Sequence, residues 1–82
     1  MRILRPDETL KSTGDTRSPH YDKVAKGLFT RPIKIGERAA GWPEHEVEAI
    51  NAARVAGATA EQIKRLVEKL HEQRAAGMPV LA

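Results

Sequence analysis

Apolar side chains recur every three or four residues in the last third of the chain. One side of a helical projection carries four of them: Ile63, Leu66, Val67 and Leu70. This spacing predicts a helix that buries one face. Thr59 and Gln62 have capping-box spacing, so we expect the helix to begin at Thr59 and to continue to about residue 75 or 76. Gly77 and Pro79 then break the pattern.

A second apolar face of helical spacing precedes this helix. It consists of Val47, Ile50 and Val55. We expect the helix to open at Trp42 and Pro43, with the proline at the first helical position, and to end at Gly57. The helix dipole favours anions near its start. Three acidic residues are interpreted as such charges: Glu44, Glu46 and Glu48.

Two short helices are predicted in the first third of the chain. The first has Asp7 as its expected N-cap and ends at Gly14, a residue type that adopts the left-handed conformation readily. The second is expected over residues 19–26, with Ser18 as N-cap and Pro19 at the first helical position. Its expected buried face consists of Tyr21, Val24, Ala25 and Leu28.

Between residues 33 and 42 the apolar period changes from about 3.6 to 2. Ile33 and Ile35 flank Lys34, and residues 40–42 repeat the alternation. A turn over residues 36–39, which begins with a glycine, would join the two segments. The pattern therefore predicts a small β-hairpin.

These elements together predict a mainly α fold with a small β-hairpin, the winged helix-turn-helix. In that fold the second helix enters the major groove of DNA and the hairpin, or wing, contacts the flanking backbone. We expect one domain over residues 1–77, with four helices, and a flexible C-terminal tail over residues 78–82. The last helix is expected either to pack on the domain or to form a dimer interface.

Composition restricts the class of protein further. The chain has 82 residues, no cysteine and no apolar run near the length of a membrane span. Such a length leaves a small core and little surface for an enzyme pocket. No secretory signal is recognisable at the N-terminus, so we expect a cytoplasmic, nucleoid-associated protein.

Positive charge is concentrated in the predicted DNA-binding half. Residues 1–42 contain nine Lys and Arg against five Asp and Glu, whereas residues 43–82 contain five against six. A protein with one surface for phosphates and another for water or protein needs such an asymmetry. Double-stranded DNA is therefore the expected partner.

The predicted recognition helix, the turn before it and the wing supply the candidate DNA-contacting residues. They are Thr16, Arg17, Ser18, His20, Tyr21, Lys23, Lys26, Lys34 and Arg38. Arg17 could reach a phosphate or the O6 and N7 edge of a guanine, and Arg38 lies at the expected wing tip. The alternative interpretation of Lys23 and Lys26 is an ordinary solvated helix face. Trp42 is interpreted as a core residue that anchors the wing.

Other chemistry finds little support in the sequence. The three histidines lack the spacing of convergent metal ligands: His20, His45 and His71. No nucleophile is paired with a base, and no glycine-rich phosphate loop or carboxylate pair stands out. We expect no metal, no cofactor and no enzymatic activity.

Several short motifs occur in an order that resembles a known family. They include Thr13-Gly14, Arg17-Ser18 with Tyr21, residues 32–36 and Gly41-Trp42-Pro43 followed by Glu46-Val47. Over residues 3 to about 54 the chain resembles the AlpA-like prophage regulators, small DNA-binding proteins of the MerR-type winged helix class. Pro19, Asp22 and Lys23 depart from the usual residue types of that family, and Asp22 would repel a nearby phosphate.

The resemblance implies a sequence-specific transcriptional regulator of a prophage or other mobile element. Its recognition helix would be residues 19–26 and its wing residues 33–42. An excisionase that bends attachment-site DNA is an alternative, and an integrase or the transcription machinery would be a further partner. A different alternative is a protein-interaction adaptor that uses helix 59–76, which is also the expected surface of a homodimer.

Overall fold

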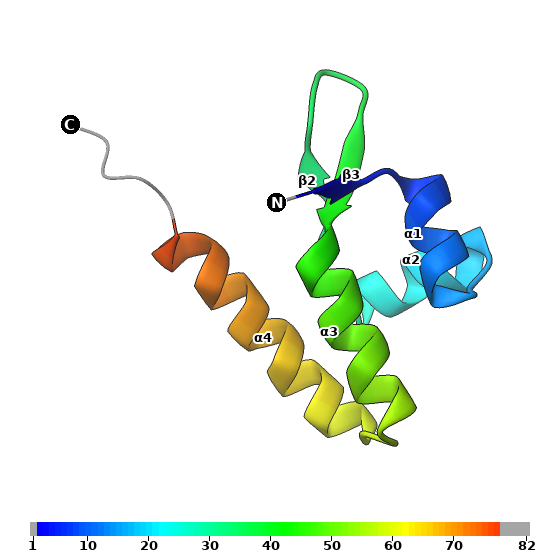
Figure 1. Cartoon of the computed structure of the whole chain (residues 1–82), viewed down its shortest axis with the longest axis vertical. Helices are drawn as coiled ribbons and strands as arrows, with labels where there is room; N and C mark the ends of the chain where they lie inside the picture. Colours follow the sequence, from blue (N-terminus) through cyan, green and yellow to red (C-terminus); the bar gives the residue numbers. More distant parts are fainter. Residues whose placement is uncertain (1, 78–82) are drawn as a thin grey trace.

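Four helices and a three-stranded antiparallel sheet form the domain (Figure 1). The structure is a computed structural model that describes residues 2–77. In chain order the elements are β1 (Ile3–Leu4), α1 (Pro6–Thr13), α2 (Arg17–Ala25), β2 (Ile33–Lys34), β3 (Ala40–Pro43), α3 (Glu44–Val55) and α4 (Ala60–Ala76). The predicted class, a winged-helix-like small domain, is confirmed. The predicted tail over residues 78–82 lies outside the described residues.

Both short N-terminal helices begin earlier than predicted. The N-cap of α1 is Arg5, not Asp7, because Pro6 begins the helix and the Glu8 carboxylate accepts a hydrogen bond from the Arg5 N–H at 3.3 Å. The N-cap of α2 is Thr16, not Ser18, which places Pro19 third in the helix. Proline is tolerated there because the first four N–H groups of a helix have no intrahelical partner. Gly14 ends α1 in the left-handed conformation, with φ of 78°, as predicted.

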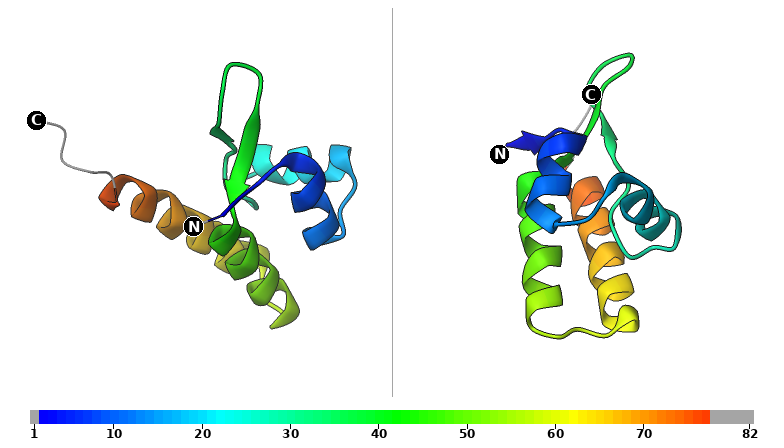
Figure 2. Two further views of the ribbon diagram at one scale, coloured as in Figure 1. Left: turned by 45° about the horizontal axis from the view of Figure 1, so that its top comes forward. Right: turned by 90° about the vertical axis from the view of Figure 1, so that its right-hand side faces the viewer.

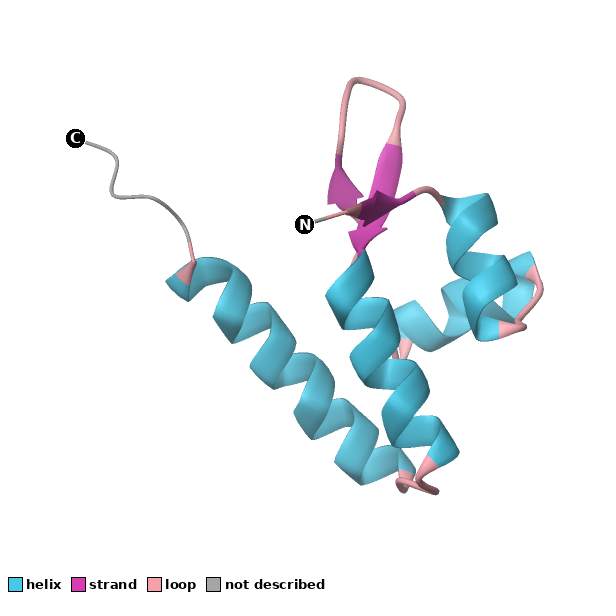
Figure 3. Ribbon diagram, in the orientation of Figure 1, coloured by secondary structure: helices cyan, strands magenta, loops and turns pink. Residues whose placement is uncertain are grey.

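The predicted hairpin is confirmed, and a third strand joins it. In the antiparallel pair β2 and β3, Ile33 lies opposite Gly41 and Lys34 opposite Ala40. Strand β1 pairs with the other edge of β3, so the strand order is β1-β3-β2. The hairpin projects beyond the helices (Figures 1 and 3).

Gly41 lies at the crowded centre of this sheet. A Cβ atom there would lie 2.6 Å from the Leu4 carbonyl oxygen and 2.8 Å from Cδ1 of Ile35. Real Cβ atoms do not approach other atoms so closely. A residue without a side chain therefore lets β1 and the wing pack on the same strand.

Helices α3 and α4 lie side by side, and β3 leads directly into α3 (Figure 2). Pro43 still belongs to β3 and is the N-cap of α3, so this helix begins one residue later than predicted. The capping box of Thr59 and Gln62 at the start of α4 is confirmed, as is the end of α4 at Ala76.

The core lies between the sheet and the helices. Its buried apolar residues are Leu4, Phe29, Trp42, Val47, Ile50, Val67 and Leu70, with Val24, Ala49, Ile63 and Leu66 packed against them. The apolar stripe of α4 therefore packs on the domain, the first of the two predicted arrangements. Val55 is 89% exposed, contrary to prediction. At 100° per residue it lies about 140° around the helix from Ile50.

The buried face of α2 is not the predicted one. His20 is fully buried, whereas Ala25 is exposed and Tyr21 is 36% exposed. The His20 imidazole lies edge-on to the rings of Phe29 and Trp42, each with a centroid distance of 4.7 Å. A neutral imidazole fills the aromatic position that the sequence analysis assigned to Tyr21.

Burial determines the protonation of this histidine. Removal of the ring from water lowers the pKa of His20, although the nearby Asp15 carboxylate acts in the opposite direction. Lys23 and Arg54 lower it further. Neither ring nitrogen has a hydrogen-bond partner among residues 2–77. The folded protein therefore favours neutral His20.

The exposure difference along α3 predicts unequal stability effects. Ile50→Val should lower the free energy of unfolding by about 0.5–1.5 kcal/mol because it removes a buried methylene group. Val55→Ala removes more carbon but should change stability by less than about 0.5 kcal/mol, since its side chain is already in water. Urea unfolding of both variants measures the difference. An equal or larger loss for Val55→Ala would contradict the assigned helix face.

The lowered pKa of His20 predicts that the protein loses stability in mild acid, at pH values above those at which carboxyl groups titrate. In the unfolded chain histidines bind protons below about pH 6.5, whereas His20 in the fold resists protonation. The unfolded state then binds more protons, so stability should fall as the pH falls from 7.5 to 5.5. Urea unfolding at several pH values should show a smaller loss for His20→Phe than for the parent chain. Equal pH slopes would contradict the burial of a neutral His20.

Candidate nucleic-acid interface

The start of α2 presents polar side chains to solvent. Thr16, Arg17 and Ser18 are all exposed at the turn after α1. Tyr21, one turn further along α2, keeps a partly exposed ring whose centroid lies 6.0 Å from that of Trp42. Side chains at this end of a recognition helix are the ones that contact base edges in helix-turn-helix complexes.

Two of the candidate residues on α2, His20 and Lys23, make contacts within the protein and are at least partly buried. His20 is fully buried, so the hypothesis that it hydrogen-bonds to DNA does not fit this structure. The Lys23 ammonium lies 2.8 Å from Oδ1 of Asp15 and its side chain is 28% exposed. Arg54 on α3 donates to the other oxygen of the same carboxylate at 3.3 Å. Asp15 thus connects α2 and α3 to the turn between α1 and α2.

The Asp15 carboxyl is stabilised in its ionised form. Burial alone would raise the pKa of Asp15, but the hydrogen bonds from Lys23 and Arg54, together with their charges, hold the pKa below its ordinary value. Lys23 is therefore not the freely solvated residue that the sequence suggested, and its contact with DNA stays a prediction.

The cations at the two ends of α2, Arg17 and the C-cap residue Lys26, also face acidic side chains. Lys26 pairs with Asp22 at 2.8 Å across one turn of helix, and both side chains are more than half exposed. Arg17 lies 3.7 Å from Asp7 of α1, and these side chains are also largely exposed. Exposed pairs of this kind are worth about 0–1 kcal/mol, so either cation can exchange its partner for a phosphate.

The cations of the wing have no such partners. Lys34 and Arg38 are exposed, and neither lies within 4.0 Å of an acidic side chain among residues 2–77. Arg31, just before β2, shares both properties. Arg31 lies outside the wing predicted from the sequence, which begins at residue 33, although its position beside Pro32 is a usable signal.

The strand register places Lys34 on the same side of the sheet as α2. Side chains alternate along β3, so Ala40 and Trp42 share one face and Gly41 the other. Lys34 lies opposite Ala40 and therefore shares the face of Trp42, against which His20 of α2 packs. The start of α2 and Lys34 of the wing can thus contact the same ligand.

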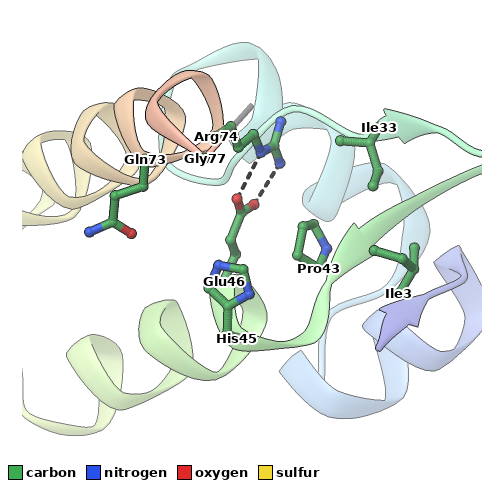
Figure 4. Close-up of a pocket in the computed structure, with 8 residues that line it drawn as sticks. All are labelled: Ile3, Ile33, Pro43, His45, Glu46, Gln73, Arg74 and Gly77. Carbon is green, nitrogen blue, oxygen red and sulfur yellow. Dashed lines mark hydrogen bonds and ion pairs between the residues drawn. The ribbon is translucent and has the colours of Figure 1, made fainter. Parts of the chain in front are cut away.

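The opposite face of the sheet carries a groove of about 310 Å³ (Figure 4). Ile3, Ile33 and Pro43 form its apolar wall, and residues of α3 and α4 close the other side. Figure 4 shows Glu46 reaching from α3 toward Arg74 on α4 within this groove. Glu46 lies in the first turn of α3, as predicted, but its carboxylate is fully buried and pairs with Arg74.

Residues 2–77 contain no group of three or more potential ligands that could hold a metal ion. Within the same residues, no helix combines the length and the apolar character that a membrane crossing requires.

Comparisons with known proteins give one family model and a phage relative. The family model described as "Prophage CP4-57 regulatory protein (AlpA)" matches residues 2–54, which is more than half of the chain. "Uncharacterized protein ORF88" of Enterobacteria phage P4 is 36% identical over 56 residues, which cover 68% of this chain and 64% of that protein. The chain thus spans less than two thirds of the length of this curated relative. No solved structure matches.

The matched residues include α1, α2 and the whole sheet, whereas α4 lies outside them. The wider likeness to MerR-type proteins stays a prediction. On the strength of the family model and the phage relative, the chain belongs to the AlpA family of prophage regulatory proteins.

Proposed function

We propose that this protein binds duplex DNA sequence-specifically through α2 and the wing, and thereby regulates transcription of a prophage or other mobile element. Its family is one of regulatory proteins and not of enzymes. The exposed start of α2 would enter the major groove, and the wing would contact the adjacent backbone.

A group of three exposed cations on and beside the wing carries this proposal. Arg31, Lys34 and Arg38 follow the wing and have no acidic partner within 4.0 Å in the described residues. Phosphate contacts by such side chains provide much of the affinity of DNA-binding proteins. The sequence preference would come from side chains at the start of α2, which are Thr16, Arg17, Ser18 and Tyr21. Lys26 would leave Asp22 and contact a phosphate.

The apolar stripe of α4 bears on two of the alternatives. Val67 and Leu70 are buried in the core of the domain. Neither an adaptor nor a homodimer could use them without unpacking the helix, so these alternatives are not favoured. An excisionase would use the same DNA-binding surface, and a measurement of DNA bending distinguishes it from a regulator that leaves its site straight.

Fluorescence anisotropy with a random duplex pool, across a series of salt concentrations, tests the proposal. The slope of log affinity against log salt should be about −0.9 for each phosphate contacted, and we expect at least about three contacts from the wing. Single-stranded DNA of the same length is the control. The absence of duplex binding at low salt would overturn the proposed function.

Removal of single wing cations should reduce this slope. Arg31→Ala, Lys34→Ala and Arg38→Ala should each change it by about 0.9, because each removes one phosphate contact. Arg65→Ala, at an exposed position on α4, is the matched control and should leave the slope unchanged. If the wing variants behave like Arg65→Ala, the wing does not contact DNA.

Neutralisation of Asp22 should strengthen DNA binding. Asp22→Asn frees Lys26 and removes an anion from the exposed side of α2. An exposed charge interaction is worth about 0.2–1 kcal/mol, which predicts an affinity gain of up to about fivefold at low salt. Glu68→Gln on α4 is the control for the change in net charge. A weaker complex for Asp22→Asn would indicate that α2 does not face the phosphates.

A further inference from the structure

Three hydrogen bonds hold the backbone where the chain enters the wing. The Trp42 indole N–H donates to the Thr30 carbonyl oxygen at 2.7 Å. The Arg31 N–H donates to Nε2 of His71 at 3.1 Å, and Nη2 of Arg74 donates to the Arg31 carbonyl oxygen at 2.8 Å. Both peptide groups of Arg31 are thus held by side chains of α4.

A buried ion pair fixes Arg74 itself. Nε of Arg74 lies 2.7 Å from Oε2 of Glu46, whose side chain is fully buried, and a second hydrogen bond joins the same groups. The two dashed contacts are visible in Figure 4. A buried carboxylate without its cation is strongly unfavourable, so this pair ties the end of α4 to the start of α3.

The wing has few constraints of its own. Strand β2 contains two residues, and Pro32 before it has no N–H to donate. Residues 35–38 are exposed. The direction of the hairpin therefore depends on β3 and on the backbone at Arg31.

We propose that His71 and Arg74 of α4 are positioning residues for the wing: by holding the Arg31 backbone they set the direction in which Arg31, Lys34 and Arg38 meet DNA. This inference rests on the proposed function. It gives α4, which lies outside the residues matched by the family model, a role in DNA binding without contact to DNA.

The hydrogen bond from Arg31 requires a neutral His71. Nε2 of His71 accepts the hydrogen bond from the Arg31 N–H. In a protonated ring Nε2 would itself carry a hydrogen, so two donors would face each other. The charged groups around the ring are Arg31 on the wing side, Arg74 on α4 and Glu46 on α3. Protonation would therefore break the contact and place a third cation among them.

Two substitutions at position 71 and one control separate positioning from stability. His71→Leu removes the acceptor, whereas His71→Gln places a carbonyl oxygen near the former Nε2 and cannot be protonated. Leu66→Ala weakens the packing of α4 without touching Arg31. Each variant is compared at a temperature where unfolding curves show it to be folded, by amide hydrogen exchange and by DNA binding across a salt series.

His71→Leu should speed exchange of the Arg31 amide about fivefold to tenfold, as expected for the loss of one hydrogen bond, and should reduce the salt slope by about one to two phosphate contacts. Leu66→Ala should leave both unchanged, and His71→Gln should restore both. Burial and the charges of Arg31 and Arg74 lower the pKa of His71. The parent chain should therefore lose more duplex affinity than His71→Gln only as the pH falls below about 6.5.

The outcomes distinguish the two proposals. If the parent chain binds duplex DNA and His71→Leu binds with the same slope, the positioning role is wrong while the proposed function stands. The same conclusion follows if Leu66→Ala and His71→Leu change binding equally. If the parent chain does not bind duplex DNA, the proposed function fails and the positioning role in DNA binding fails with it.

Discussion

Trp42 is the residue on which the arrangement of the domain depends. Its side chain is fully buried between the sheet and α2, and the His20 and Phe29 rings meet it edge-on. Its indole N–H donates a hydrogen bond to the Thr30 carbonyl oxygen, and buried indoles usually have such a partner. One side chain thus connects the wing, α2 and the segment between them, in a chain with only three Phe, Tyr or Trp residues to build from.

The sequence predicted the elements whose signals are local. The period of two predicted the hairpin, and the 3.6-residue period with a capping box predicted α4, which has Thr59 as its N-cap and spans Ala60–Ala76. Strand β1 was missed because two residues carry no period, and its partner lies about 40 positions away. Val55 was misplaced because an apolar residue was counted without its angle around the helix.

The errors at the candidate site have a common cause, which is that sequence patterns assign polar residues to the surface. His20 and Glu46 are both buried, one among aromatic rings and the other against Arg74. Their burial depends on partners from distant parts of the chain. Lys23 is a similar case, since a count of charges does not reveal that Asp15 holds it. The exposed residues at the start of α2 and on the wing were found because exposure is what polar patterns predict best.

The small space above Gly41 also constrains how this fold can vary. Strand β1 pairs with β3 so closely that any side chain at position 41 would meet the Leu4 backbone, and the side chains of Ile3 and of Ile35 in the wing also approach this position. The N-terminal strand and the wing are therefore not independent modules. An insertion or a swapped hairpin that alters the wing must preserve this close approach, so the loop over residues 36–39, and not the strands, is the place where this wing can accept a change in length.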